Sequence, residues 1–231
     1  MCVLGIVPAR GGSKGVPGKN MEIIAGKPLI GYTIDVALNS GIFDTLVVTS
    51  ESSSILDYAG SFDVTLHTRP SYLATDESPV IDTVLAVLSF AESSFNKEYS
   101  SVFILQPTSP LREPWHLREA LQLLNDNPGA GSVISVTKTA DNHPARMYSI
   151  NNGYLDPLQA EYEQARRQDL PAVYIRNGSI YITRRDVLVN GKSVMTKPAL
   201  AYPMDEKYHL NIDTLRDMQL AKLVMEGGVR C

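Results

Sequence analysis

The sequence contains few cysteines and histidines, and their placement excludes two kinds of site. The two cysteines, Cys2 and Cys231, stand at opposite ends of the 231-residue chain, and no CxxC pair is present. No disulfide framework is therefore indicated. The four histidines are scattered without the spacing of a zinc site. We expect a protein of the reducing cytoplasm that has no zinc centre.

Long apolar runs and net positive charge are also lacking. No apolar stretch approaches the roughly 20 residues of a membrane-spanning helix. The first apolar run is too short for a signal peptide and has no basic region before it. The 21 Lys and Arg residues are outnumbered by 25 Asp and Glu residues, which gives a net charge of −4. A general nucleic-acid binder needs a broad basic face, so we expect neither a membrane nor a nucleic acid as partner.

The sequence does contain a regular alternation of strand-like and helix-like segments. Short continuous apolar runs predict strands over residues 2–9, 45–50, 63–68, 101–106, 132–137 and 178–183. Apolar residues at helical spacing predict helices over 28–41, 52–60, 79–92, 114–126 and about 215–225. Such repetition implies right-handed crossovers and helices on both faces of the sheet. We predict a single α/β domain over residues 1–231, with a Rossmann-like, mostly parallel sheet.

Residues 139–172 interrupt this alternation. The segment is polar and contains several prolines, tyrosines and arginines. It is too long for a simple turn, and insertions of this length are usually functional or ordered by a partner. We interpret it as an inserted extension.

A glycine-rich cationic loop follows the first predicted strand. Residues 8–20 read PARGGSKGVPGKN, with four glycines, the cations Arg10, Lys14 and Lys19, and no carboxylate. Glycines allow a ligand to approach the backbone closely, and free N–H groups in such turns bind anions. The loop lies at the carboxyl edge of the sheet, where open α/β sheets bind ligands, but it lacks the P-loop and dinucleotide spacings. Its composition favours triphosphate binding over the alternative, a solvated surface loop.

Four segments, in this order, resemble a known family: residues 8–20, GKPLIGYTI (26–34), LQPTSPLR (105–112) and NIDT (211–214). They are similar to the cytidylyltransferases that make CMP-activated nonulosonic acids, the acylneuraminate, legionaminate and pseudaminate type. The resemblance implies a nucleotide-diphospho-sugar transferase type of fold. It also implies Mg²⁺-dependent transfer of CMP from CTP to the anomeric hydroxyl of a nine-carbon α-keto acid sugar, with release of pyrophosphate. A CMP-Kdo or other sugar nucleotidyltransferase, and a nucleotide-binding module without catalysis, remain alternatives.

The resemblance assigns residues to the nucleotide. Arg10 and Lys19 match phosphate-contacting positions and, with Asp213, form the expected catalytic set. The expected nucleotide-binding residues are Ala9, Arg10, Gly11, Gly12, Ser13, Lys19, Asn20, Asp76 and Ser78. For Ser78, capping of the helix over 79–92 is an alternative interpretation.

The resemblance also assigns residues to the sugar. The expected sugar-binding residues are Gln106, Arg112, Arg167, Arg176 and Asn177. A sugar carboxylate favours an arginine, and Arg166, Arg167 and Arg176 are available for this role. For Arg112, an ordinary structural ion pair is the alternative.

The resemblance places Mg²⁺ at Asp213 and Asn211. The family usually has two aspartates at these positions, and an amide oxygen can bind Mg²⁺ but brings no charge. Capping of the last helix is the alternative for Asp213, because Thr214 and Asp217 follow. The extension at 139–172 matches a family segment that reaches across to a second subunit, which implies a homodimer.

Overall fold

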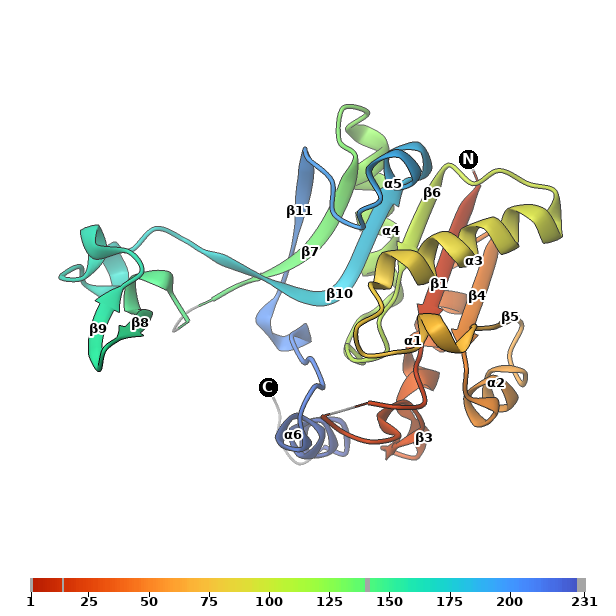
Figure 1. The fold of residues 1–231 in the computed structure, drawn as a ribbon, viewed down its shortest axis with the longest axis horizontal. Helices are drawn as coiled ribbons and strands as arrows, with labels where there is room; N and C mark the ends of the chain where they lie inside the picture. Colours follow the sequence, from red (N-terminus) through yellow and green to blue (C-terminus); the bar gives the residue numbers. More distant parts are fainter. Residues whose placement is uncertain (1, 14, 140–141, 228–231) are drawn as a thin grey trace.

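A seven-stranded sheet forms the centre of the protein, and helices pack on both of its faces (Figure 1). The structure is a computed structural model, and it describes residues 2–13, 15–139 and 142–227. The strand order is β11-β7-β10-β6-β1-β4-β5. This is the α/β architecture that the alternation of segments predicts.

The main sheet consists of β1 (Val3–Pro8), β4 (Thr45–Ser50), β5 (Thr65–Thr68), β6 (Ser101–Ile104), β7 (Ser132–Lys138), β10 (Tyr174–Arg184) and β11 (Ala199–Met204). The helices are α1 (Leu29–Ser40), α2 (Ser53–Ala59), α3 (Val80–Phe95), α4 (Pro114–Asp126), α5 (Arg185–Gly191) and α6 (Leu215–Met225). Two small hairpins pair β2 (Ile23–Ile24) with β3 (Lys27–Pro28), and β8 (Tyr148–Asn151) with β9 (Tyr154–Pro157). The predicted bounds are confirmed to the residue for 45–50, 114–126 and 215–225, while the predicted segments contain neither α5 nor β11.

One strand makes the sheet mostly, and not entirely, parallel. β10 runs antiparallel to β6 on one side and to β7 on the other. The remaining neighbours in the described sheet pair in parallel. The chain enters β10 from the extension and not from a crossover helix, so the handedness rule for parallel crossovers does not govern its direction.

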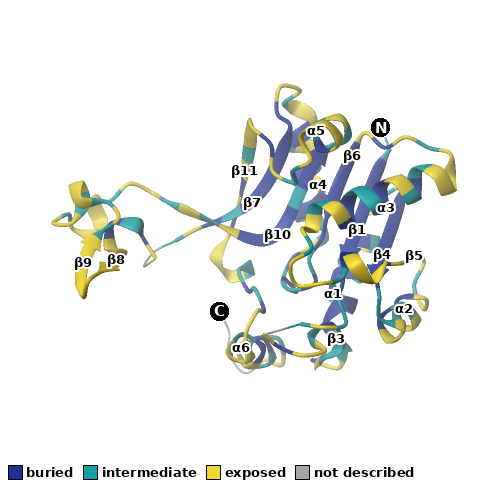
Figure 2. Cartoon of the chain, viewed as in Figure 1, coloured by how far each residue is buried: buried dark blue, intermediate teal, exposed yellow. Residues whose placement is uncertain are grey.

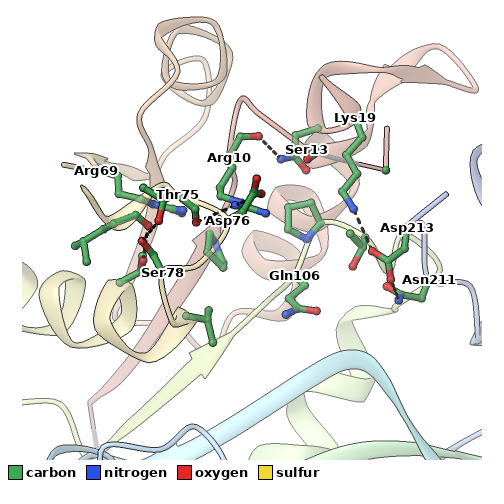
Figure 3. Close-up of a pocket in the computed structure, with 18 residues that line it drawn as sticks. Arg10, Ser13, Lys19, Arg69, Thr75, Asp76, Ser78, Gln106, Asn211 and Asp213 are labelled. Carbon is green, nitrogen blue, oxygen red and sulfur yellow. Dashed lines mark hydrogen bonds and ion pairs between the residues drawn. The ribbon is translucent and has the colours of Figure 1, made fainter. Parts of the chain in front are cut away.

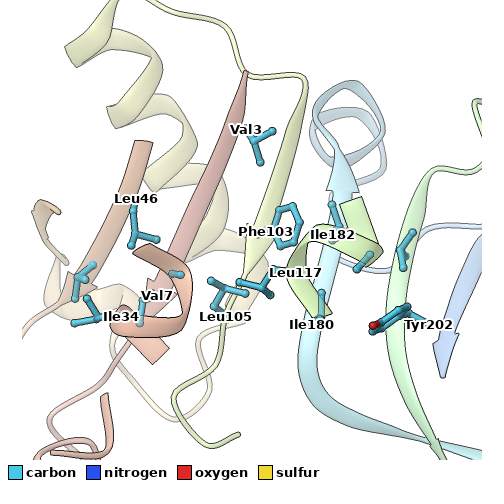
Figure 4. Packing of buried hydrophobic residues seen from close by; sticks show 14 of the residues in the cluster. Val3, Val7, Ile34, Leu46, Phe103, Leu105, Leu117, Ile180, Ile182 and Tyr202 are labelled. Atoms are coloured by element: carbon cyan, nitrogen blue, oxygen red, sulfur yellow. The ribbon is translucent and has the colours of Figure 1, made fainter. Parts of the chain in front are cut away.

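The continuous apolar runs of the strands are explained by burial on both faces. On one face α1 and α4 cover the sheet, with Ile34 and Leu117 packed in the same cluster as Val7, Phe103 and Ile180 (Figure 4). The opposite face packs under α3 and α5 in a second cluster, to which β1 contributes the alternate residues of its run. Each fully buried aliphatic side chain contributes about 1.5–3 kcal/mol to folding, so both faces stabilise the strands.

A third, smaller apolar cluster positions the C-terminal segment. Ile24 and Leu29 pack with Ile212, Met218 and other residues that flank or belong to α6. Thr214 begins α6 with a capping box in which its side chain accepts the Asp217 N–H. The cluster and the cap together hold residues 211–213 against the glycine loop.

The extension carries β8 and β9 away from the main sheet at the end of two long chain segments (Figure 1). Most of this hairpin is exposed, in contrast to the buried strands of the main sheet (Figure 2). In the described part of the chain, no helix combines the length and the apolar character needed to cross a membrane.

Candidate active site

A cavity of about 520 Å³ opens at the carboxyl edge of the sheet (Figure 3). Its walls come from the glycine loop, the segment between β5 and α3, the loop after β6 and the segment before α6. These segments are distant in sequence and meet because the carboxyl ends of parallel strands share one edge. Nine of the predicted site residues line the cavity: Arg10, Ser13, Lys19, Asn20, Asp76, Ser78, Gln106, Asn211 and Asp213.

Arg10 reaches across the cavity from the end of β1. Its Nη1 donates to the Thr75 carbonyl oxygen and to Asp76 Oδ1, both at 3.0 Å. The Arg10 and Asp76 side chains remain about one third exposed, at 34% and 39%. A partly exposed ion pair of this kind is held weakly, so an incoming anion can compete for the guanidinium.

Lys19 and Asn20 close the other end of the glycine loop. Lys19 Nζ donates to the Ile212 carbonyl oxygen at 2.8 Å and to Asp213 Oδ1 at 3.1 Å. Asn20 is buried, and its Nδ2 donates to the Arg10 carbonyl oxygen at 2.8 Å. The Asn20 side chain thereby ties the two ends of the loop together, while Lys19 remains at the cavity wall.

The predicted backbone residues of the loop do not share one role. Ala9 is buried in the core, and its N–H donates to the Thr49 carbonyl oxygen at 3.0 Å. The Gly11 N–H, considered as a phosphate donor, instead donates to Glu51 Oε1 at 2.7 Å. A Cβ added at Gly12 would meet no atom of the described residues within 4 Å, apart from its chain neighbours, so this glycine borders open space. Lys14 lies outside the described residues.

Asn211 and Asp213 lie side by side on the segment before α6. Asn211 Nδ2 donates to Asp213 Oδ2 at 2.6 Å, which fixes the direction of the amide. Asn211 Oδ1 is buried and has no hydrogen-bond partner among the described residues. The capping interpretation of Asp213 is wrong, because Thr214 occupies the N-cap and Asp217 completes the box.

Ser78 orders the turn before α3 and does not cap that helix. Its hydroxyl donates to the Tyr72 carbonyl oxygen at 2.6 Å and lies 2.6 Å from Thr75 Oγ1. Pro79 stands at the N-cap of α3 without a side-chain cap. The capping alternative is therefore wrong, and Ser78 lies at the cavity wall.

Arg112 departs from its expected place at the sugar. Its side chain is 2% exposed and does not line the cavity. The guanidinium donates to the carbonyl oxygens of Ser179 and Gln106 and, at 2.9 Å, to Thr33 Oγ1. Burial lowers the pKa of Arg112 to about 9. The structure corrects the prediction of a direct sugar contact: Arg112 joins β10 to the loop after β6 from inside the fold.

Asn177 is also turned into the protein, at a bulge in β10. Its Oδ1 accepts from Ser135 Oγ at 2.5 Å and its Nδ2 donates to Thr137 Oγ1 at 3.0 Å. The pairing of β10 with β7 shifts register at this bulge. The next residue, Gly178, has φ of 76°, and a Cβ there would lie 3.4 Å from Gln106 Oε1. The expected sugar contact of the Asn177 side chain is corrected: this side chain shapes the bulge, and the Gly178 backbone faces the Gln106 side chain.

The other two expected sugar-binding arginines lie away from the cavity lining. Arg176 is exposed on β10, with Nη1 3.9 Å from Met195 Sδ. Arg167 lies in the extension, where it borders a separate hollow of about 490 Å³ together with Lys138 and His143. Within the described chain, neither arginine is brought to the Arg10–Lys19 cavity.

Arg69 lines the cavity and is not among the predicted residues. It is 5% exposed, and its Nη2 donates to the Thr49 carbonyl oxygen at 2.9 Å, while its Nε has no hydrogen-bond partner in the described part of the chain. Burial lowers the pKa of Arg69, which Glu51 raises and Arg10 lowers further. Its position directly after β5 was the available signal, because cations at the carboxyl ends of strands reach the same edge.

Comparison with known proteins agrees with this geometry. The model of the family described as "Cytidylyltransferase" matches residues 4–224. The chain is 36% identical over 232 residues to a CMP-N,N'-diacetyllegionaminic acid synthase of Legionella pneumophila, covering 98% of this chain and 97% of the relative. It is 34% identical over 215 residues to an N-acylneuraminate cytidylyltransferase of Streptococcus agalactiae serotype III, covering 92% of this chain and 50% of the relative. The chain thus spans about half the length of the streptococcal relative.

A solved structure supports the same fold. A CMP:2-keto-3-deoxy-manno-octonic acid synthetase, solved in complex with CTP, superimposes with a TM-score of 0.75 and 18% identity. The match covers 99% of this chain and 100% of that protein. The family model and the Legionella pneumophila relative both match nearly the whole sequence. The chain therefore belongs to the cytidylyltransferase family.

Proposed function

We propose that this chain transfers CMP from CTP to the anomeric hydroxyl of a nine-carbon α-keto acid sugar of the sialic, legionaminic or pseudaminic acid type. In this reaction the hydroxyl oxygen forms a bond to the α-phosphorus. The bond from the α-phosphorus to the bridging oxygen breaks, pyrophosphate leaves and the hydroxyl proton passes to solvent. The main demand on the protein is to hold the two reactants in line and to stabilise the charge of the triphosphate.

The observation that carries this proposal is the placement of Arg10 and Lys19 on one cavity, each paired with a carboxylate. Asp76 is paired with Arg10, and Asp213 is paired with Lys19. A triphosphate brings more negative charge than either carboxylate, so it can replace them on the two cations. Arg69 adds a third, buried cation to the same wall.

The names of the relatives support a nonulosonic acid as the acceptor. The legionellal relative, named for N,N'-diacetyllegionaminic acid, matches along nearly its whole length, and the streptococcal one is named for N-acylneuraminate. The amide side chains of Gln106 and Asn211 line the cavity and form a polar corner beside the proposed phosphate site. Such a corner suits the hydroxyl and acyl groups of a sugar.

Magnesium fits the residues of the segment before α6. The described residues contain no group of three His, Cys, Asp or Glu side chains that could hold a metal ion. Mg²⁺ however binds through one or two carboxylates together with substrate phosphates and waters. The exposed Asp213 carboxylate would hold it there, and Asn211 would add its Oδ1 after its amide turns, because Nδ2 is the atom that faces Asp213. The ion would neutralise charge on the triphosphate and lower the pKa of a bound hydroxyl.

We further propose that the chain acts as a homodimer in the cytoplasm, with residues 139–172 as the dimerisation element of a single domain. The extension exposes several large apolar side chains: Tyr148 at 40%, Ile150 at 73%, Tyr154 at 79%, Leu155 at 67% and Leu158 at 58%. Contiguous exposed apolar side chains mark interaction sites. Light scattering of the purified protein should give twice the mass of the chain. The double variant Ile150→Ser, Tyr154→Ser should give the mass of a single chain.

Pyrophosphate release tests the proposed reaction. We expect release with CTP, Mg²⁺ and at least one of N-acetylneuraminic, legionaminic and pseudaminic acids. Arg10→Ala should lose most of this activity, whereas Lys97→Ala, away from the cavity lining, should retain it. Activity with Kdo alone would favour the CMP-Kdo alternative. CTP binding without turnover for every acid would favour a non-catalytic module.

A further inference from the structure

The side chain of the residue that follows β4 supports the glycine loop. Glu51, the residue after β4, accepts the Gly11 N–H on Oε1 at 2.7 Å, although the two residues are 40 positions apart. Glu51 is partly buried, and the described residues that line the cavity do not include it. Its contact with the loop is therefore made from behind the cavity wall.

The backbone of the loop lies unusually close to this corner. A Cβ at Gly11 would stand 2.9 Å from Ser52 Cβ and 3.5 Å from Glu51 Oε1. Gly11 has no left-handed φ, so packing and not backbone conformation accounts for glycine here. By contrast, Gly12 borders open space. The loop thus packs Gly11 against the segment that follows β4 and leaves Gly12 exposed.

Glu51 also acts on Arg69, the buried cation of the cavity. Its negative charge raises the pKa of Arg69 against the lowering effects of burial and of Arg10. Arg69 Nη2 and the Ala9 N–H share the Thr49 carbonyl oxygen as acceptor, at 2.9 and 3.0 Å. The last residues of β4 and Glu51 therefore hold both the start of the loop and the arginine beside it.

We propose that Glu51 is a positioning residue that clamps the glycine loop through the Gly11 N–H and so holds Arg10 in place for the triphosphate. Glu51 acts through Gly11 and does not touch substrate. This role rests on the proposed function of the cavity. The reach of the side chain, more than its charge, determines the effect, because the clamp depends on an oxygen placed at the Gly11 N–H.

Two substitutions separate reach from charge. Glu51→Gln keeps an oxygen at the same distance from the backbone, so it should retain the clamp. Glu51→Asp keeps the charge but is shorter by one methylene, so it should release the loop. Asp57→Asn, an exposed acid on the neighbouring α2, serves as the control.

Hydrogen exchange of the ligand-free protein measures the clamp without any assay of activity. In Glu51→Asp the amides of residues 10–13 should exchange about tenfold faster than in the wild type, and in Glu51→Gln within about threefold of it. With CTP, Glu51→Asp should raise KM about tenfold while KM for the acceptor sugar stays within about twofold. Thermal unfolding verifies that each variant is folded. If Glu51→Asp does not fold, Glu51→Gln still tests the clamp, because the exchange rates of Glu51→Gln must remain within about threefold of the wild type.

Failure of the clamp and failure of the proposed function give different results. Faster exchange in Glu51→Asp from a protein that never turns over CTP would uphold the clamp and reject the proposed function. Unchanged exchange in Glu51→Asp, equal changes in both variants, or a larger change in Glu51→Gln would overturn the clamp even if the enzyme is active.

Discussion

Lys19 Nζ lies 3.1 Å from Asp213 Oδ1, a contact between residues 194 positions apart. The Lys19 side chain is 14% exposed, whereas the Asp213 side chain is 62% exposed and faces the cavity. The pair joins the loop that we propose binds phosphate to the segment that we propose binds Mg²⁺. Substrate binding must therefore redistribute the partners of both residues.

Asp213→Asn should lower Mg²⁺-dependent turnover by at least about a hundredfold and leave the fold intact. The change removes the carboxylate that the proposed metal site depends on. The measurement is kcat for pyrophosphate release, together with circular dichroism. Asp63→Asn, a substitution distant from the cavity lining, is the control. A rate for Asp213→Asn close to the wild type would reject the assignment of Asp213.

Asn211→Asp should increase the stabilisation that Mg²⁺ gives to the protein. Asn211 Nδ2 donates to Asp213 Oδ2 at 2.6 Å. An aspartate at position 211 would lose this donor, and its carboxylate would repel that of Asp213. A divalent cation would relieve that repulsion. Thermal unfolding with and without Mg²⁺ should give a larger upward shift of Tm in the variant, by roughly 2 °C or more. Equal shifts in both proteins would place Mg²⁺ elsewhere.

Gly15→Ala should destabilise the protein, and Gly12→Ala should not. A Cβ at position 15 would overlap the Asp213 carbonyl oxygen, whereas one at position 12 would meet no described atom within 4 Å beyond its chain neighbours. We expect a loss of about 1–3 kcal/mol in the free energy of unfolding for Gly15→Ala and less than about 0.5 kcal/mol for Gly12→Ala. Urea denaturation measures both. Equal stabilities would mean that the loop does not pack against Asp213.

Arg112→Gln should lower stability by about 3 kcal/mol or more. The substitution removes a buried guanidinium that donates to the carbonyl oxygens of Ser179 and Gln106 and to Thr33 Oγ1. Arg176→Gln, at an exposed position, should change the free energy of unfolding by less than about 0.5 kcal/mol. Urea denaturation of the two variants provides the comparison. A stable Arg112→Gln protein with a raised KM for the sugar would restore the assignment of Arg112 to the substrate.

His116 should make the protein less stable in acid. Its Nδ1 accepts the Glu113 N–H at 2.9 Å, and its Nε2 is buried with no hydrogen-bond partner in the structure of residues 2–13, 15–139 and 142–227. Burial lowers the pKa of His116 to about 4; Glu119 raises it, and Arg112 and Lys207 lower it further. In the unfolded chain this histidine is protonated below about pH 6.5, whereas in the folded chain it is protonated only below about pH 4. The free energy of unfolding therefore falls as the pH is lowered from about 6.5 to about 4.

The expected loss is up to about 3 kcal/mol. Urea denaturation at pH 7 and pH 4.5 measures it against His116→Asn, whose side-chain oxygen can still accept the Glu113 N–H. The variant should show a shallower loss of stability on acidification. Parallel losses in the two proteins would mean that His116 titrates normally.

The order of the elements and the place of the glycine loop could be predicted because they depend on local patterns. Buried parallel strands have continuous apolar runs, and their carboxyl ends share an edge. β11 is an edge strand, and edge strands tolerate proline. Because Pro203 lies within β11, this strand lacks a recognisable apolar run. Its pairing with β7 is a tertiary event that the local sequence does not indicate.

The directions of individual side chains could not be predicted. The bulge in β10 turns Asn177 into the core, and the surrounding carbonyl oxygens bury Arg112. A matching position in a motif places a residue near the site without fixing which way its side chain points. Arg69 and Glu51 were missed for the converse reason, since each is a single charged residue after a strand, with no motif around it.

The most direct test of the account is a crystal structure of the protein with CTP and Mg²⁺. The triphosphate should lie in the cavity, with phosphate oxygens within hydrogen-bond distance of Arg10 and Lys19 and the metal ion against Asp213. A nucleotide bound elsewhere, with the glycine loop facing solvent, would contradict it.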